Sequence, residues 1–142
     1  MFLNIILGFI IPWLFGVFHL YKKDKTLIPI FGPFICFLSL VINEFGFHHA
    51  FWKIKPLIDQ TISSLPIDLG FYPIVKCYML FFIDKKKNPY LTIFVFTLSC
   101  TTLELVLVLL GKVIYGNDWN IFWTFFSYLI PNIILYLFYL YI

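Results

Sequence analysis

Two ionisable side chains lie inside long apolar stretches of this sequence and are the first candidates for chemistry. Glu104 belongs to the stretch 90–111, and Lys76 belongs to the stretch 66–83. At 1.5 Å per residue, they would lie roughly 10 and 15 Å below the same end of two helices. A charge inside a bilayer is costly unless it is paired or hydrated. The sequence therefore predicts either an ion pair between Glu104 and Lys76 or a functional site at Glu104.

Glu104 also shares a predicted helix face with two hydroxyl residues. Thr97, Thr101 and Glu104 follow a spacing of four and three residues, which places them on one side of a helix. Such a face packs against other helices, where hydroxyls and a buried pair hold a bundle together. We favour this structural interpretation over a proton or cation site, or a catalytic acid, at Glu104.

A second group of polar residues surrounds two adjacent histidines. Glu44 and His48 are four residues apart and would share a helix face, whereas His49 would point elsewhere. Zinc sites normally have three or four ligands, so Asp59 or Asp68 would have to complete the set through folding of the loop. We therefore expect interfacial histidines, with metal binding by His48 and His49 as the weaker alternative, and no cofactor.

Apolar segments of membrane-spanning length position these residues. The chain has 142 residues, of which 62% are hydrophobic and only 12% charged. A soluble domain of this size cannot bury so much apolar surface, whereas runs of about 20 apolar residues cross a bilayer as helices. We expect an all-α integral membrane protein with a single domain, 1–142, and an interfacial outer loop, 44–65. The predicted spans are about 2–21, 26–43, 66–83, 90–111 and 121–142.

The lysines predict the orientation of these five spans. The loops 22–25 and 84–88 hold three lysines each, whereas 44–65 holds Lys53 and Lys55 and 112–120 holds Lys112. Basic residues favour the cytoplasmic side, so the amino terminus is expected outside and the carboxyl terminus in the cytoplasm. The expected location is the cell (inner) membrane of a bacterium.

Spans two and three run in the same directions as spans four and five, which suggests a parallel two-helix repeat. The repeat would place Glu44 and Glu104 at equivalent outer helix ends. Asp68 lies at a similar depth, just after Pro66. We therefore test the hypothesis that three carboxylates share one outward-facing cavity.

Three stretches resemble a family of small, uncharacterised multipass membrane proteins of spore-forming Firmicutes, the bacilli and clostridia. They are Asn43-Glu44 through Trp52, LPIDLGFYP at 65–73, and LELVLVLLGKVIYGNDWN at 103–120. The family carries no known activity, but an acid in the fourth span belongs to its pattern. The resemblance therefore favours Glu104 over the histidines.

A weaker resemblance is to the small heterodimeric lycopene cyclases, which carry a Pro-x-Glu-Glu loop. Here Pro66-Ile67-Asp68 supplies one carboxylate, and Leu69 replaces the second acid. Protonation of a polyene needs a correctly placed carboxyl group, and this departure counts against that chemistry.

The expected function is that of a structural or partner-binding membrane component. The alternatives are a small transporter or channel subunit using Glu104, and a membrane-embedded enzyme acting on a lipid or isoprenoid. The candidate acids of such an enzyme are Glu104, Glu44 and Asp68. Expected partners are the lipid bilayer and a second copy or another membrane protein. Nucleic acid is not expected, because the lysines lie in short loops and form no long basic face.

Overall fold

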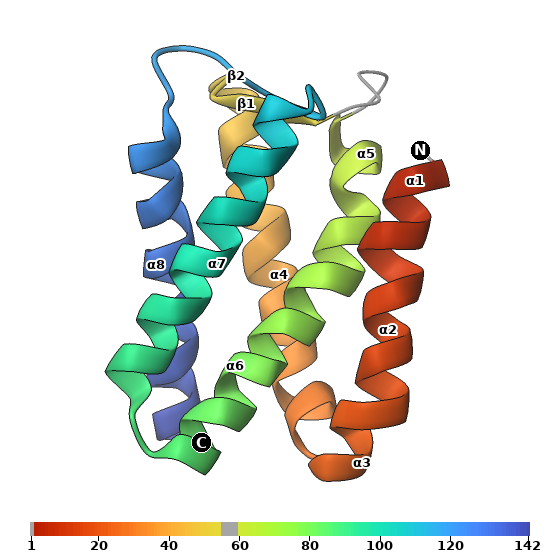
Figure 1. Ribbon diagram of the computed structural model, residues 1–142, viewed down its shortest axis with the longest axis vertical. Helices are drawn as coiled ribbons and strands as arrows, with labels where there is room; N and C mark the ends of the chain where they lie inside the picture. Colours follow the sequence, from red (N-terminus) through yellow and green to blue (C-terminus); the bar gives the residue numbers. More distant parts are fainter. Residues whose placement is uncertain (1, 55–59) are drawn as a thin grey trace.

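The computed structural model describes residues 2–54 and 60–142, and this part of the chain is a bundle of helices (Figure 1). About 83% of the protein is helical, and five helices are long and apolar enough to cross a membrane. The prediction of an all-α fold with five helices of membrane-spanning length is confirmed. We call these helices spans 1 to 5: Phe2–Lys23, Leu27–His48, Thr61–Lys86, Pro89–Leu109 and Ile121–Tyr141.

Spans 1 and 3 contain π-helical turns close to their prolines. Span 1 consists of α1 (Phe2–Ile5), η1 (Ile6–Ile10), α2 (Ile11–Phe15), η2 (Gly16–Leu20) and α3 (Tyr21–Lys23). Span 3 consists of α5 (Gln60–Pro66), η3 (Ile67–Phe71) and α6 (Tyr72–Lys86). Proline has no backbone N–H and clashes with the preceding turn, so the helix widens locally to accommodate it.

The other three spans are regular α-helices. They are α4 (Leu27–His48), α7 (Pro89–Leu109) and α8 (Ile121–Tyr141). Asn88 and Asn120 are the N-cap residues of α7 and α8. Each of these side chains accepts hydrogen bonding from backbone N–H groups of the first helical turn.

The loop between spans 2 and 3 and the loop between spans 4 and 5 together form a small antiparallel sheet of two strands. Strand β1 (Trp52–Ile54) pairs with strand β2 (Val113–Tyr115) in antiparallel register, with Trp52 opposite Tyr115. The predicted interfacial loop 44–65 is therefore corrected: α4 continues to His48, a strand follows, and α5 begins at Gln60. Pairing satisfies backbone groups that would otherwise lack partners beside a bilayer. Lys55 and Asp59 lie outside the described residues.

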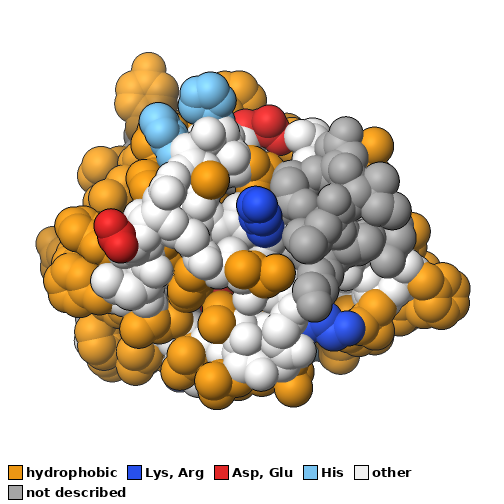
Figure 2. All heavy atoms as spheres, turned by 90° about the horizontal axis from the view of Figure 1, so that it is seen from above, with side chains coloured by type: hydrophobic (Ala, Val, Ile, Leu, Met, Phe, Trp, Pro, Cys, Tyr) orange, Lys and Arg blue, Asp and Glu red, His pale blue; other side chains and the backbone are white. Residues whose placement is uncertain are grey.

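The largest apolar core lies toward the opposite end, where spans 2, 3 and 5 meet. Its buried members come from all five spans: Leu20, Leu27, Phe31, Ile35, Cys77, Met79, Leu80, Ile83, Ile93 and Leu135. The sheet end, seen from above in Figure 2, has hydrophobic side chains around its rim. The apolar core therefore lies toward the end away from the sheet, whereas Asp68 and Thr124 are completely buried nearer to the sheet.

Span 1 packs closely against span 3. Gly8 and Gly70 face each other at this contact, and a Cβ at Gly70 would lie 2.4 Å from the carbonyl oxygen of Gly8. Beside it, the indole N–H of Trp13 donates to the carbonyl of Leu69 at 2.9 Å. Small residues allow such close approach of two helices within a bilayer.

Candidate functional site

Glu104 is held by two tyrosine hydroxyls. It projects from α7, and its carboxylate accepts hydrogen bonds from Tyr115 on β2 and from Tyr128 on α8, the latter at 3.0 Å. The Tyr128 hydroxyl is in turn 3.0 Å from the hydroxyl of Tyr72 on α6. Four elements of the fold therefore meet at this one acid.

Thr124 and Trp119 extend the hydrogen-bond network around Glu104. The indole N–H of Trp119 donates to the Thr124 hydroxyl at 2.9 Å, and that hydroxyl lies 2.8 Å from the Tyr115 hydroxyl. The single proton of the Thr124 hydroxyl also has the backbone carbonyl of Asn120 as an acceptor, at 3.4 Å. Glu104 is therefore the end of a hydrogen-bond network that includes Tyr115, Thr124 and Trp119.

The same neighbourhood affects Tyr115. Burial, and secondly the negative charge of Glu104, raise the pKa of Tyr115 well above its ordinary value. Tyr115 therefore keeps its proton and remains a donor to Glu104 at neutral pH.

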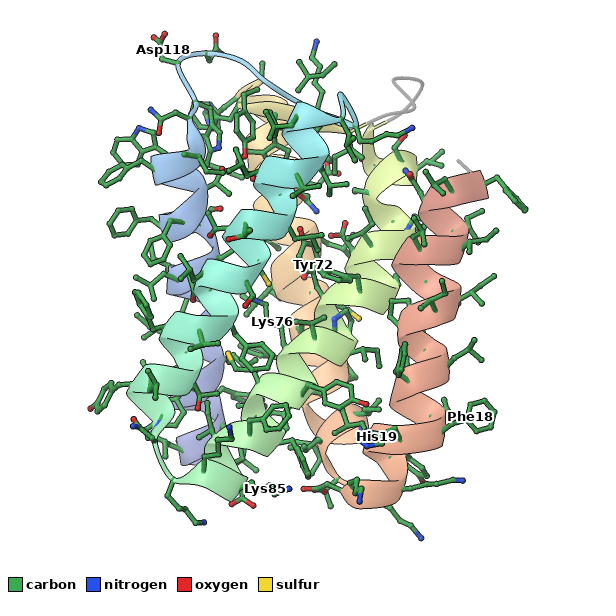
Figure 3. The ribbon with its side chains drawn as sticks, viewed as in Figure 1. Phe18, His19, Tyr72, Lys76, Lys85 and Asp118 are labelled. Carbon is green, nitrogen blue, oxygen red and sulfur yellow. The ribbon has the colours of Figure 1, made fainter. Side chains whose placement is uncertain are left out.

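Lys76 has partners of its own. Its buried ammonium donates to the side-chain oxygen of Asn132, whose amide nitrogen donates to the Thr97 hydroxyl at 2.8 Å. The ammonium also lies over the ring of Tyr128, 5.5 Å from the ring centre. Figure 3 shows Lys76 and Tyr72 in the interior of the bundle, well away from Asp118 at the sheet end.

The expected ion pair between Glu104 and Lys76 is therefore not formed in this structure. Among the described residues, the ion pair within 4.0 Å joins Lys87 and Asp84 at 3.5 Å. Tyr128 connects the two candidates instead, because its hydroxyl binds Glu104 and its ring face meets Lys76. Glu104 thus lacks a cation in direct contact within the part of the chain that the structure describes.

A cavity of about 340 Å³ lies beside Glu104, between span 1 and α7. The sheet covers its outer end through Trp52, Ile54 and Val113. Its other apolar walls comprise Leu3, Leu7, Gly8, Ile67, Phe71, Cys100, Leu103 and Leu107. Its polar lining consists of Asn4, Asn43, Tyr72, Glu104, Lys112 and Tyr128.

A second cavity, of about 50 Å³, lies between α4 and α8 and shares several walls with the first. Lys76 lines it together with Glu104, Ser39 and Ser127. This volume is enough for one or two water molecules, which polar walls of this kind can hold. Ile35 and Leu135 also line this cavity and belong to the apolar core.

Asp68 lies apart from both cavities. It is completely buried and accepts hydrogen bonds from Asn43 at 2.6 Å and from Ser64 at 3.0 Å. The side-chain oxygen of Asn43 accepts in turn from the indole N–H of Trp52 at 3.1 Å. Asp68 therefore ties span 3 to α4 and, through Asn43, to the sheet.

Glu44 and the two histidines lie on the surface of the sheet end. Glu44 is exposed and accepts a hydrogen bond from Thr61. His48 and His49 are exposed, with ring centres 5.2 Å apart, and His49 stacks on Phe51 at 5.4 Å. Within residues 2–54 and 60–142, no group of three potential metal ligands forms around them.

The hypothesis of one cavity shared by three carboxylates is therefore not supported. Of Glu44, Asp68 and Glu104, Glu104 lines both of the cavities described above, and the other two line neither of them. Asp68 reaches the cavities indirectly, because its partner Asn43 lines both of them.

The sequence reasoning missed the residues that hold the two candidates. Thr124, Tyr128 and Asn132 follow one another at intervals of four on α8, and Thr124 and Asn132 are completely buried. This spacing puts three polar groups on one face of an otherwise apolar helix. That polar stripe was the signal that could have identified them.

No family model, no curated protein and no solved structure matches this chain. The resemblance to the Firmicutes membrane proteins stays an expectation, and the function has to be argued from the site itself.

Proposed function

We propose that this protein binds an amphipathic, lipid-like molecule inside the membrane, with the polar end of that molecule beside Glu104. The observation that supports this is the cavity of about 340 Å³ with apolar walls and a carboxylate in its lining. Small-molecule sites are mostly apolar cavities of roughly 300–1,000 Å³ with a few placed polar groups.

The walls of this cavity reach the lipid-facing surface of the bundle. Leu3 and Leu7 on span 1 are 47% and 53% exposed, and Leu103 on α7 is 42% exposed. Apolar side chains on the outside of a membrane bundle contact acyl chains. A ligand with a hydrocarbon tail can therefore enter between span 1 and α7 without crossing the aqueous phase.

The geometry favours binding over acid catalysis and over conduction. The carboxylate oxygens of Glu104 are both engaged by tyrosine hydroxyls of the protein, which leaves neither of them free to hand a proton to a substrate. A pore through one copy of the protein would have to cross the apolar core around Leu80 and Leu135. The expected role as a structural or partner-binding component stays a prediction that these contacts do not address.

The cavity can be blocked from its lipid side. Leu103→Trp adds a large ring to its wall, whereas Leu98→Trp adds the same ring to an exposed position of α7 that lines neither cavity. After purification in mild detergent, lipids retained per protein are quantified by mass spectrometry. We expect a several-fold loss of retained lipid in Leu103→Trp only. Equal retention in the two folded variants would contradict the proposal.

The proposed location is the bacterial cell membrane, with the sheet end outside and the carboxyl terminus in the cytoplasm. The lysines support it, because Lys53 and Lys112 mark the sheet end, and the clusters 22–25 and 84–88 mark the other. Figure 3 shows Lys85 at the end of the bundle opposite Asp118. The pairing of β1 with β2 supports the proposed repeat, because each outer loop contributes one strand.

Cysteine labelling tests this orientation. Ala50→Cys should react with a membrane-impermeant maleimide added to intact cells, whereas Lys86→Cys should react only after the cells are opened. Both parent residues are exposed, and the native thiols are buried or half-buried. Labelling of Lys86→Cys in intact cells would overturn the orientation.

A further inference from the structure

We infer that the ligand of this cavity is a zwitterionic phospholipid, whose ammonium group binds Glu104 and whose phosphate binds Lys112. The inference rests on the proposed function and names the chemistry of the polar end. The choice of a zwitterionic phospholipid follows from three features of the cavity: its two charged side chains, its aromatic lining and its apolar walls on the lipid side.

Glu104 supplies the site for a cation. Its carboxylate is half-buried, lines the cavity and receives two neutral hydroxyl donors. A carboxyl group in a medium of low dielectric constant interacts strongly with a positive charge close to it. Lys76 does not provide that contact, because its ammonium is bound to Asn132. A cationic group of a bound ligand would provide that contact.

The aromatic lining suits an ammonium group in particular. Trp52, Phe71, Tyr72 and Tyr128 line the same cavity as Glu104. Aromatic faces attract ammonium and quaternary ammonium groups, and the attraction is greater where water is excluded. Tyr128 already has one cation over its ring, that of Lys76.

Lys112 supplies the site for a phosphate at the mouth of the cavity. It is exposed, follows the end of α7 at Leu109, and lines the cavity next to Val113 of the sheet. The five residues from Glu104 to Leu109 rise about 8 Å along α7, and Lys112 follows three residues later, outside the helix. The long, flexible stem of Lys112 lets its ammonium group turn toward the cavity. The apolar walls formed by Leu3, Leu7 and Leu103 leave the acyl chains on the lipid side.

The experiment compares lipids on the unmodified full chain. Detergent-purified protein is delipidated and offered equal amounts of phosphatidylethanolamine and phosphatidylglycerol, and bound lipid is counted by native mass spectrometry. We expect phosphatidylethanolamine to exceed phosphatidylglycerol at least about fivefold, because one charge-assisted contact corresponds to roughly that factor or more. Phosphatidylethanolamine acylated on its nitrogen keeps the phosphate but loses the cation, and should bind like phosphatidylglycerol.

Two pairs of variants assign the two contacts. Glu104→Gln should abolish the preference for phosphatidylethanolamine, whereas Glu44→Gln, an exposed carboxylate outside the cavity, should retain it. Lys112→Gln should weaken both lipids several-fold while keeping their ratio. Lys53→Gln, the other described lysine of this end, should change neither.

The outcomes separate this inference from the proposed function. Equal binding of the three lipids, abolished by Leu103→Trp, would overturn the zwitterion assignment and leave a lipid site in place. Lipid binding that Leu103→Trp leaves unchanged would overturn both. If Glu104→Gln fails to fold, the headgroup series on the unmodified protein still decides, because it needs no variant.

Discussion

Replacing Gly70 with alanine should loosen the first span from the rest of the bundle. The new Cβ would lie 2.4 Å from the carbonyl oxygen of Gly8 and 2.6 Å from the Cα of Phe9. Both are backbone atoms and cannot rotate away, so η1 and η3 would have to separate by about 1 Å to restore ordinary contact near 3.5 Å.

The size of the effect follows from three terms. Overpacking a close contact costs about 1–3 kcal/mol, and straining the adjacent hydrogen bond from Trp13 to Leu69 costs up to about 1 kcal/mol more. Alanine gains up to about 1 kcal/mol over glycine in a helix interior. The net expectation for Gly70→Ala is a loss of about 1–3 kcal/mol in the free energy of unfolding.

Gly32→Ala is the matched control. The nearest atom to its Cβ is the Cγ2 of Ile28 at 3.7 Å, an ordinary contact, so helix propensity alone should act and stability should be unchanged or slightly higher. Unfolding of both variants in detergent micelles, followed by circular dichroism, measures the difference. Gly70→Ala should also retain less lipid, because Leu3 and Leu7 of span 1 form a wall of the cavity. If Gly70→Ala is as stable as Gly32→Ala, the close packing of spans 1 and 3 is refuted.

Three further predictions concern single side chains. Folding raises the pKa of Tyr115, so the stability that this residue contributes is present below about pH 10 and declines as the pH rises from there. In unfolding measured as a function of pH, the unmodified protein should therefore lose more stability between about pH 10 and 12 than Tyr115→Phe does. Asn132→Leu removes the acceptor of the buried Lys76 ammonium and should cost about 2–3 kcal/mol in the same unfolding assay. Trp52→Phe removes the donor to Asn43 and should cost about 1 kcal/mol, measured by denaturant unfolding.

Matched variants serve as controls for Asn132→Leu and Trp52→Phe. Thr102→Val removes an exposed hydroxyl that bonds to its own helix and should change stability by less than about 0.5 kcal/mol. Trp123→Phe alters an exposed tryptophan of α8 and should be equally mild. If Asn132→Leu costs no more than Thr102→Val, the ammonium has another acceptor. If Trp52→Phe costs no more than Trp123→Phe, the bond to Asn43 does not secure the sheet.

The outer loops show how far prediction from the sequence could reach. Composition indicated that 44–65 was neither a span nor a free loop, but strand β1 depends on β2, which lies far along the chain. Pairing between distant segments leaves no local signature, because each strand has only three residues. Likewise, the sequence placed Asp68 near the outer end of the third span as a candidate acid, whereas the structure buries it completely. Its partners Asn43 and Ser64 could not be predicted, because they depend on how spans 2 and 3 face each other.

Five helices of membrane-spanning length, with Glu104 and Lys76 inside two of them, could be predicted from the amino-acid sequence alone. Length and hydrophobicity are local properties, so they can be read without the fold. The contacts of Glu104 with Tyr115 and Tyr128, and of Lys76 with Asn132, are visible only in the folded structure. The sequence gives the depth of a side chain along its helix, but its partner depends on how each helix is rotated and packed against its neighbours. That packing also leaves the cavity beside Glu104, and with it the chemistry of the site.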